Sequence, residues 1–89
     1  MDNAAMPRTA HLWLVYILQC ADGTLYTGIT VNLERRLTAH RHGVASKYTR
    51  ARLPVRLAYH EAQPSRSSAL RREALIKQMP RREKLRLIG

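Results

Sequence analysis

The chain has 89 residues, of which 45% are hydrophobic, so we expect one domain with a small core and not a disordered chain. It contains no run of 18 apolar residues, and its first ten residues lack a basic segment followed by an apolar one, so we expect neither a membrane span nor a secretory signal. Thirteen arginines and three lysines face six acidic residues, and the resulting formal net charge of +10 predicts attraction to polyanions such as nucleic acid.

Cysteine usage and the distribution of basic residues narrow the class further. The single cysteine, Cys20, cannot form an internal disulfide, which fits a reducing cytoplasm and excludes a zinc site built from several cysteines. The excess of basic residues runs from Arg35 to Arg86 and is not confined to one tail. Because arginine suits bidentate contact with phosphate, we expect a nucleic-acid partner. The single cysteine leads us to expect a cytoplasmic location.

The first third of the chain predicts a tail followed by a hairpin. We expect residues 1–10 to form a loose N-terminal tail and residues 11–89 to form a single domain. Residues 12–19 are rich in aromatic and branched side chains, which predicts a strand buried on both faces. After the turn signal Ala21-Asp22-Gly23, residues 24–30 predict a second, antiparallel strand.

The length of the hairpin loop decides whether Tyr16 and Tyr26 lie together. A two-residue loop would place the two phenols on opposite faces of the sheet, because side chains alternate along a strand. A three-residue loop pairs Tyr16 with Gly28 and places both phenols on one face, with Gly23 in the left-handed conformation that such loops need. We favour the three-residue loop, although the sequence leaves the other register open.

The rest of the chain predicts three helices and one more strand. Asn32 is a good N-cap and Gly43 a good stop for a first helix, and residues 43–53 read as a basic loop. Val55, Leu57 and Tyr59 alternate with Arg56, Ala58 and His60, which predicts a half-buried strand with the first three residues on one side. Capping residues at 65–68 begin a helix to about residue 78, and Pro80 begins a last helix to about residue 88. The fold class is therefore α+β, a three-stranded antiparallel sheet flanked by helices in the order ββαβαα.

Helical periodicity predicts which polar side chains lie near the core. In the first helix Leu33 and Leu37 mark the buried side, with Arg36 and His40 inside or beside it. In the second, an apolar arc contains Glu73 and is formed by Ala69, Leu70, Ala74 and Ile76. A carboxylate in an apolar arc needs a partner, either a metal or a basic side chain. We expect Arg71 and Arg72 to face water or phosphate.

Several motifs in this order resemble the GIY-YIG nuclease family, in particular its small single-domain subgroup of uncharacterised proteins. The two name-giving triplets correspond to Leu14-Val15-Tyr16 and Tyr26-Thr27-Gly28, and the family's helix motif to Asn32-Leu33-Glu34-Arg35-Arg36-Leu37 with His40 after it. The stretch Ser46-Lys47-Tyr48-Thr49-Arg50, with Pro54 beyond it, resembles the small subgroup, and Glu73 with Ile76-Lys77 resembles the glutamate helix. The resemblance covers residues 11 to 88.

The resemblance implies a fold of this class and hydrolysis of phosphodiester bonds in DNA with one divalent ion, Mg²⁺ or Mn²⁺. Tyr26 would assist the attacking water, Arg36 would hold the phosphate, and Glu73 would bind the metal. Tyr16 and His40 would orient water and phosphate. The candidate catalytic residues are thus Tyr16, Tyr26, Arg36, His40 and Glu73. The candidate nucleic-acid-binding residues are Arg35, Lys47, Tyr48, Arg50 and Arg72.

Two other functions stay open at this stage. The first is a non-catalytic nucleic-acid-binding module on the same fold, and the second is a partner-binding protein with a vestigial site. Glu73 could pair with Arg36 or Lys77 instead of a metal. The non-catalytic function is favoured by two differences from many family nucleases: Ile29 and Thr30 stand where a lysine often occurs, and no asparagine follows Asn32.

Overall fold

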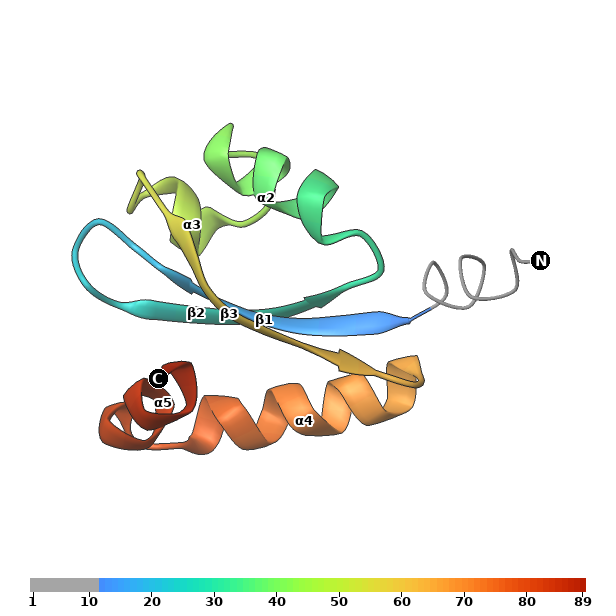
Figure 1. Cartoon of the computed structure of the whole chain (residues 1–89). Coiled ribbons are helices and arrows are strands. Elements are labelled where there is room, and N and C mark those ends of the chain that lie inside the picture. The colour runs from blue at the N-terminus through green and yellow to red at the C-terminus, as the bar shows by residue number, and fades with distance from the viewer. Residues whose placement is uncertain (1–11) are drawn as a thin grey trace.

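Three antiparallel strands form a sheet in the order β2-β1-β3, in a computed structural model that describes residues 12–89. The strands are β1 (Trp13–Gln19), β2 (Leu25–Thr30) and β3 (Arg56–Gln63). One face of the sheet is covered by α2 (Leu33–Arg41) and α3 (Lys47–Arg50), and the other by α4 (Arg66–Gln78) and α5 (Arg81–Ile88) (Figure 1). The predicted α+β fold class is confirmed.

Two expectations about the chain as a whole have different outcomes. The tail predicted for residues 1–10 lies outside the described residues, as does residue 11. Within residues 12–89, no helix is both long enough and apolar enough to cross a membrane.

The central strand β1 supplies both halves of the core, as its sequence predicts. Val15 and Ile17 are fully buried on one face, where they pack with Ala69 and Ile76 of α4. Tyr16 and Leu18 are fully buried on the opposite face, where they pack against Leu33 and Leu37 of α2. The sheet therefore separates two apolar layers, and β1 and β2 contribute Tyr16 and Tyr26 to the layer below α2.

The hairpin adopts the three-residue loop, so the favoured register is confirmed. Tyr16 pairs with Gly28, and Leu18 pairs with Tyr26. The Cys20 amide donates to the Thr24 carbonyl at 2.9 Å and closes the loop. Gly23 has a φ of 85°, the left-handed conformation expected there. Tyr16 and Tyr26 consequently lie on the same face of the sheet.

Helix α2 begins and ends where capping residues predict. The Asn32 side chain accepts a hydrogen bond from the Arg35 amide at 3.0 Å, and Gly43 beyond the helix has a φ of 76°. The prediction of a basic loop over residues 43–53 is wrong in part, because this segment contains the one-turn helix α3. Ser46 caps α3 by accepting from the Thr49 amide at 3.0 Å, a spacing that the sequence displays.

Strand β3 departs from simple alternation. Leu57 pairs with Leu18 and Tyr59 pairs with Ile17, so one extra residue of β3 is accommodated between these two pairs. The expectation that Leu57 and Tyr59 share one side is therefore wrong. Leu57 packs in the layer with Tyr16, whereas Tyr59 packs in the layer with α4.

Helix α4 begins at a capping box made by Ser65 and Ser68, as expected, but its buried side differs from the predicted apolar arc. Ala69 and Ile76 are buried, whereas Leu70 and Ala74 are exposed. Between Ala69 and Ile76, Arg72 and Glu73 are half-buried, and they pair with Glu61 and Lys77, respectively. The helix thus rests on charged as well as apolar side chains.

Candidate active site

Three of the predicted site residues meet in the layer between the sheet and α2. The rings of Tyr16 and Tyr26 have centroids 6.5 Å apart, and the His40 imidazole lies edge-on to both, at 5.7 Å and 5.2 Å. The Tyr16 hydroxyl and Nε2 of His40 form a hydrogen bond of 2.9 Å. The structure therefore brings together residues 24 positions apart in the sequence, from the central strand and the last turn of α2.

Gly28 is required by the position of the Tyr16 phenol. A Cβ atom at residue 28 would lie 2.6 Å from the Tyr16 hydroxyl oxygen and 2.7 Å from Cζ, far inside contact distance. The room that the sequence predicts beside Tyr16 is thus fully used by the phenol. Any larger residue at position 28 would move the hydroxyl that bonds His40.

His40 is completely buried and has a second partner that the sequence analysis missed. Its Nδ1 lies 2.9 Å from Oγ1 of the buried Thr49, which in turn lies 2.9 Å from the Ser46 hydroxyl. Burial, followed by the charge of Arg36, lowers the pKa of His40. The imidazole is therefore neutral at pH 7 and is shielded from solvent, so it acts on its surroundings through Tyr16.

The electrostatics of Tyr16 show which other side chains lie near it. Its pKa is raised to about 12, first by burial and then by Tyr26. Arg36 lowers this pKa by its charge and by a hydrogen bond, and Glu73 raises it. Arg36, which is exposed on α2, and Glu73, from α4, thus both influence the buried phenol.

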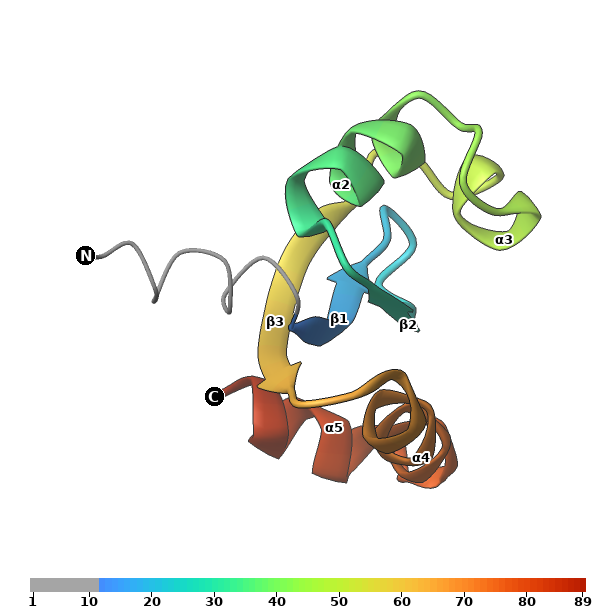
Figure 2. The same cartoon turned by 90° about the vertical axis from the view of Figure 1, so that its right-hand side faces the viewer.

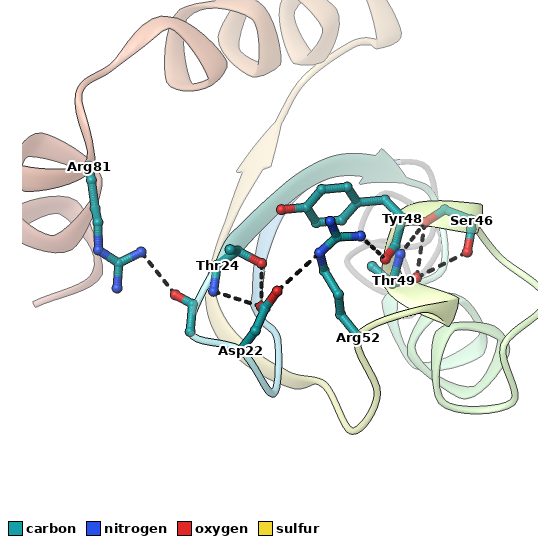
Figure 3. A network of polar contacts seen from close by, with 8 residues as sticks. Asp22, Thr24, Ser46, Tyr48, Thr49, Arg52 and Arg81 are labelled. Atoms are coloured by element: carbon teal, nitrogen blue, oxygen red, sulfur yellow. Dashed lines mark hydrogen bonds and ion pairs between the residues drawn. The ribbon is translucent and has the colours of Figure 1, made fainter.

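Tyr26 lies in a stack that links the hairpin to α3. Its ring stacks on that of Tyr48 with centroids 6.0 Å apart, and the Arg52 guanidinium carbon lies 3.8 Å from the centroid of the Tyr48 ring. Arg52 also donates to Asp22 in the hairpin turn at 3.1 Å and to the Tyr48 carbonyl at 3.0 Å (Figure 3). Tyr48, a candidate nucleic-acid-binding residue, is 38% exposed, and its ring already contacts Tyr26 and Arg52.

The other end of the hairpin turn is held by α5. Arg81 donates a hydrogen bond of 2.9 Å to the Gly23 carbonyl (Figure 3). Neither this contact nor the Asp22–Arg52 pair has a local sequence signal, because the partners are 58 and 30 residues apart. Elements of both helix layers therefore fix the turn that sets the tyrosine register.

Glu73 lies on α4, in the opposite helix layer from Tyr16 and His40. Viewed along the strands, α3 and α4 lie on either side of the edge strand β2 (Figure 2). The Glu73 side chain is 18% exposed, and its carboxylate lies 3.3 Å from the Lys77 ammonium, one of the two pairings that the sequence left open. The second, with Arg36, is not the one formed.

The acidic side chains of the described residues do not form a protein cage for a metal ion. Residues 12–89 contain no group of three or more His, Cys, Asp or Glu side chains able to hold an ion together. Mg²⁺ commonly keeps several waters and uses one or two carboxylates together with substrate phosphates. A partly exposed Glu73 fits that mode of binding, with Lys77 as the competitor for its charge.

Most of the predicted nucleic-acid-binding residues lie on the exposed surface of α2 and α3. Arg35, Lys47 and Arg50 are all exposed. Arg35 also lines a pocket with Arg36, the residue expected to hold the phosphate. A basic surface beside the tyrosine cluster is where a phosphate backbone would be attracted.

Arg72 does not face solvent as expected. It donates to the Glu61 carboxylate of β3 at 2.8 Å, with 28% of the arginine side chain and 18% of the glutamate exposed. Glu61 also accepts from Tyr59 at 2.6 Å and from Gln63 at 2.8 Å. These hydrogen bonds help to lower the pKa of Glu61 although burial opposes them, and the guanidinium is committed to joining α4 to the sheet.

Comparisons with known proteins agree with this geometry. The family model described as the GIY-YIG catalytic domain matches residues 12–86. A UPF0213 protein of Streptococcus agalactiae is 55% identical over 74 residues, which cover 83% of this chain and 84% of the relative. A UPF0213 protein of Syntrophus aciditrophicus is 56% identical over 75 residues, covering 83% of this chain and 86% of the relative.

Solved structures give the same result. The solution NMR structure of a UPF0213 protein of Bacillus halodurans matches with a TM-score of 0.57 and 44% identity, over 86% of this chain and 82% of that one. The solution NMR structure of a protein of E. faecalis matches with a TM-score of 0.58 and 40% identity, over 82% of this chain and 78% of that one.

Proposed function

Because the chain belongs to the GIY-YIG family, we propose that it is a metal-dependent endonuclease that hydrolyses phosphodiester bonds in DNA. The observation that carries this proposal is the contact cluster of Tyr16, Tyr26 and His40 with Arg36 beside it. These are the residue types that phosphodiester hydrolysis needs: hydroxyls to direct water and a guanidinium to balance phosphate charge.

Each residue has a task that follows from its surroundings. Arg36 is exposed on α2, so its guanidinium can meet a phosphate and offset the charge that develops on it. Tyr26 is half-buried, which lets its hydroxyl meet water in the site while its ring stays fixed by Tyr48 and His40. The fully buried Tyr16 and His40 hold this arrangement from behind.

Glu73 would hold the divalent ion, Mg²⁺ or Mn²⁺, which supplies Lewis-acid stabilisation of the phosphate when bound. The ion would have to compete with Lys77, whose ammonium lies 3.3 Å from this carboxylate. DNA contact would extend from Arg36 over the exposed Arg35, Lys47 and Arg50. Arg72, which pairs with Glu61, is not part of this surface.

The alternative is a nucleic-acid-binding module without catalysis, and one observation favours it. The Glu73–Lys77 pair satisfies the carboxylate without a metal. If that pair persists when nucleic acid binds, the chain would bind DNA but not cleave it.

A cleavage assay with matched variants separates the two functions. We would incubate the protein with Mg²⁺ or Mn²⁺ and with linear, flapped, branched and single-stranded DNA, and compare Glu73→Gln and Arg36→Ala with Glu83→Gln. Glu83 is exposed on α5, so its variant controls for the loss of one negative charge. The proposal expects cleavage that depends on metal and is lost in the first two variants only. Binding without cleavage by the unaltered protein favours the alternative, and equal cleavage by Glu73→Gln contradicts the role of Glu73.

A further inference from the structure

A line of four hydrogen-bonded side chains leads from the candidate site through the interior to α3. The Tyr16 hydroxyl lies 2.9 Å from Nε2 of His40, Nδ1 of His40 lies 2.9 Å from Oγ1 of Thr49, and Oγ1 lies 2.9 Å from the Ser46 hydroxyl. Tyr16, His40 and Thr49 are each 0% exposed. The proposed nuclease function assigns no task to Thr49.

The first turn of α3 fixes the position of the Thr49 hydroxyl. Ser46 accepts from the Thr49 amide at 3.0 Å, and Thr49 Oγ1 lies 3.4 Å from the Ser46 carbonyl oxygen, to which it can donate. The cap therefore holds Thr49 by its backbone, while its side chain reaches across to His40 in the last turn of α2. Oγ1 of Thr49, which faces Nδ1, is thus held in place by the N-terminal turn of α3.

The hydrogens of this line can be assigned from its chemistry. A neutral imidazole has one donor nitrogen and one acceptor nitrogen. The Tyr16 hydroxyl is a stronger donor than an imidazole N–H, and an imidazole nitrogen is a stronger acceptor than a phenol oxygen, so the hydroxyl hydrogen points to Nε2. Nδ1 then carries the ring hydrogen and donates to Thr49, whose hydroxyl donates onward to Ser46.

We propose that Thr49 is a positioning residue that fixes His40 in the tautomer with hydrogen on Nδ1, and that Nε2 thereby accepts from the Tyr16 hydroxyl and holds the phenol in place. The Tyr16 ring lies 6.5 Å from that of Tyr26, so a displaced phenol would disturb the residue that meets water. The consequence for turnover rests on the proposed nuclease function, whereas the tautomer itself does not.

A threonine needed only for its shape would behave differently. Thr49→Val keeps the volume and the branching but removes the oxygen that accepts from Nδ1–H. In that variant the Nδ1 tautomer would leave a buried donor without a partner, whereas the Nε2 tautomer can still donate to the Tyr16 oxygen. The hydroxyl, and not the packing, therefore selects the tautomer.

The test is the ¹⁵N NMR spectrum of the His40 imidazole, recorded near neutral pH on the whole protein without nucleic acid. In the unaltered protein we expect a protonated Nδ1 and an unprotonated Nε2. Thr49→Val should shift the signals toward the opposite tautomer, and Thr49→Ser, which keeps the hydroxyl, should restore the original pattern. Ser46→Ala weakens the α3 cap but leaves the Thr49 hydroxyl, so it should keep the tautomer.

Cleavage provides the second readout. Thr49→Val should lower kcat about tenfold, the worth of one well-placed hydrogen bond, with little change in KM, and Thr49→Ser should recover most of the rate. A protonated Nε2 in the unaltered protein, or an unchanged tautomer in a folded Thr49→Val, would overturn the proposal. If Thr49→Val does not fold, the spectrum of the unaltered protein still decides. If the protein cleaves no substrate, the nuclease function fails while the NMR result still decides the role of Thr49.

Discussion

Tyr16 and Tyr26 carry the same hydroxyl but lie in different surroundings. Tyr16 is fully buried, bonds His40 and has its pKa raised to about 12, whereas Tyr26 is half-buried between His40 and Tyr48. A buried phenol resists ionisation and holds its place, and a partly exposed one can meet water. The two residues therefore suit support and contact, respectively.

The raised pKa of Tyr16 predicts a loss of stability at alkaline pH. Its ordinary pKa is 10.0, and the folded protein holds the proton more tightly than the unfolded chain does. The stability that this provides is complete below pH 10 and is lost as the pH rises through about 12. Unfolding by urea, measured between pH 8 and 12, should show this decline, and Tyr16→Phe should remove part of the slope. An unchanged slope in Tyr16→Phe would contradict the assignment.

At the scale of elements, the short helix α3 connects the hairpin to the site. Its Tyr48 ring stacks on Tyr26, and Arg52 beyond it bonds both the Tyr48 carbonyl and Asp22 in the turn. The surface ion pair is exposed and adds little by itself. Its value lies in placing the guanidinium over the Tyr48 ring, which holds the stack closed.

Tyr48→Ala should disturb this stack, because Tyr26 loses its ring partner. We expect the free energy of unfolding to fall by about 1 kcal/mol and cleavage to fall roughly two- to tenfold. Chemical denaturation and steady-state kinetics measure the two effects. Tyr48→Phe keeps the ring and serves as the matched control, and a Phe variant as impaired as the Ala variant would show that the ring stack is not what matters.

The contact between α4 and β3 predicts a different outcome for two adjacent arginines. Arg72→Gln breaks the half-buried pair with Glu61 and should lower the free energy of unfolding by about 1 kcal/mol. Arg71→Gln removes the same charge from an exposed position, where the guanidinium donates to the nearby Ser67 in the same helix, and should change stability little. Thermal unfolding of both variants tests this, and equal destabilisation would contradict it.

Sequence patterns predicted the elements of this fold better than their contacts. Capping residues such as Asn32 and Ser65 act within a few positions, and the loop length set the hairpin register, so both could be read locally. The hydropathy pattern misplaced the buried side of α4. Arg72 is half-buried because it pairs with the Glu61 carboxylate, 11 residues away in the sequence. The extra residue in β3 and the Thr49–His40 bond depend on partners that no local pattern specifies.

For the molecule as a whole, positive charge is distributed over both helix layers. The α2–α3 layer carries Arg35, Lys47 and Arg50, and the α4–α5 layer carries Lys77, Arg82 and Arg86. A formal net charge of +10 on 89 residues attracts polyanions from a distance at low salt. Association with nucleic acid should therefore be fast and weakly selective, with the site deciding only what happens after contact.

This charge predicts DNA binding that weakens steeply with salt, because each phosphate contact releases a counterion. For about six phosphate contacts, the association constant should fall on the order of a thousandfold between roughly 50 and 200 mM salt. Fluorescence anisotropy with a labelled duplex measures this slope, and Arg35→Gln should make it shallower by about one contact. Affinity that does not change with salt would contradict binding through the basic surface.

The sheet order β2-β1-β3 places Tyr16 on the central strand and Tyr26 on an edge strand, so the two strands should open at different rates. Amides of the central strand exchange with deuterium only when a neighbour on one side or the other detaches, whereas the edge strand β2 can fray from a single neighbour. Hydrogen exchange should therefore be slower around Tyr16 than around Tyr26. A brief opening of β2 would expose the Tyr26 phenol to the medium while β1 and β3 stay paired.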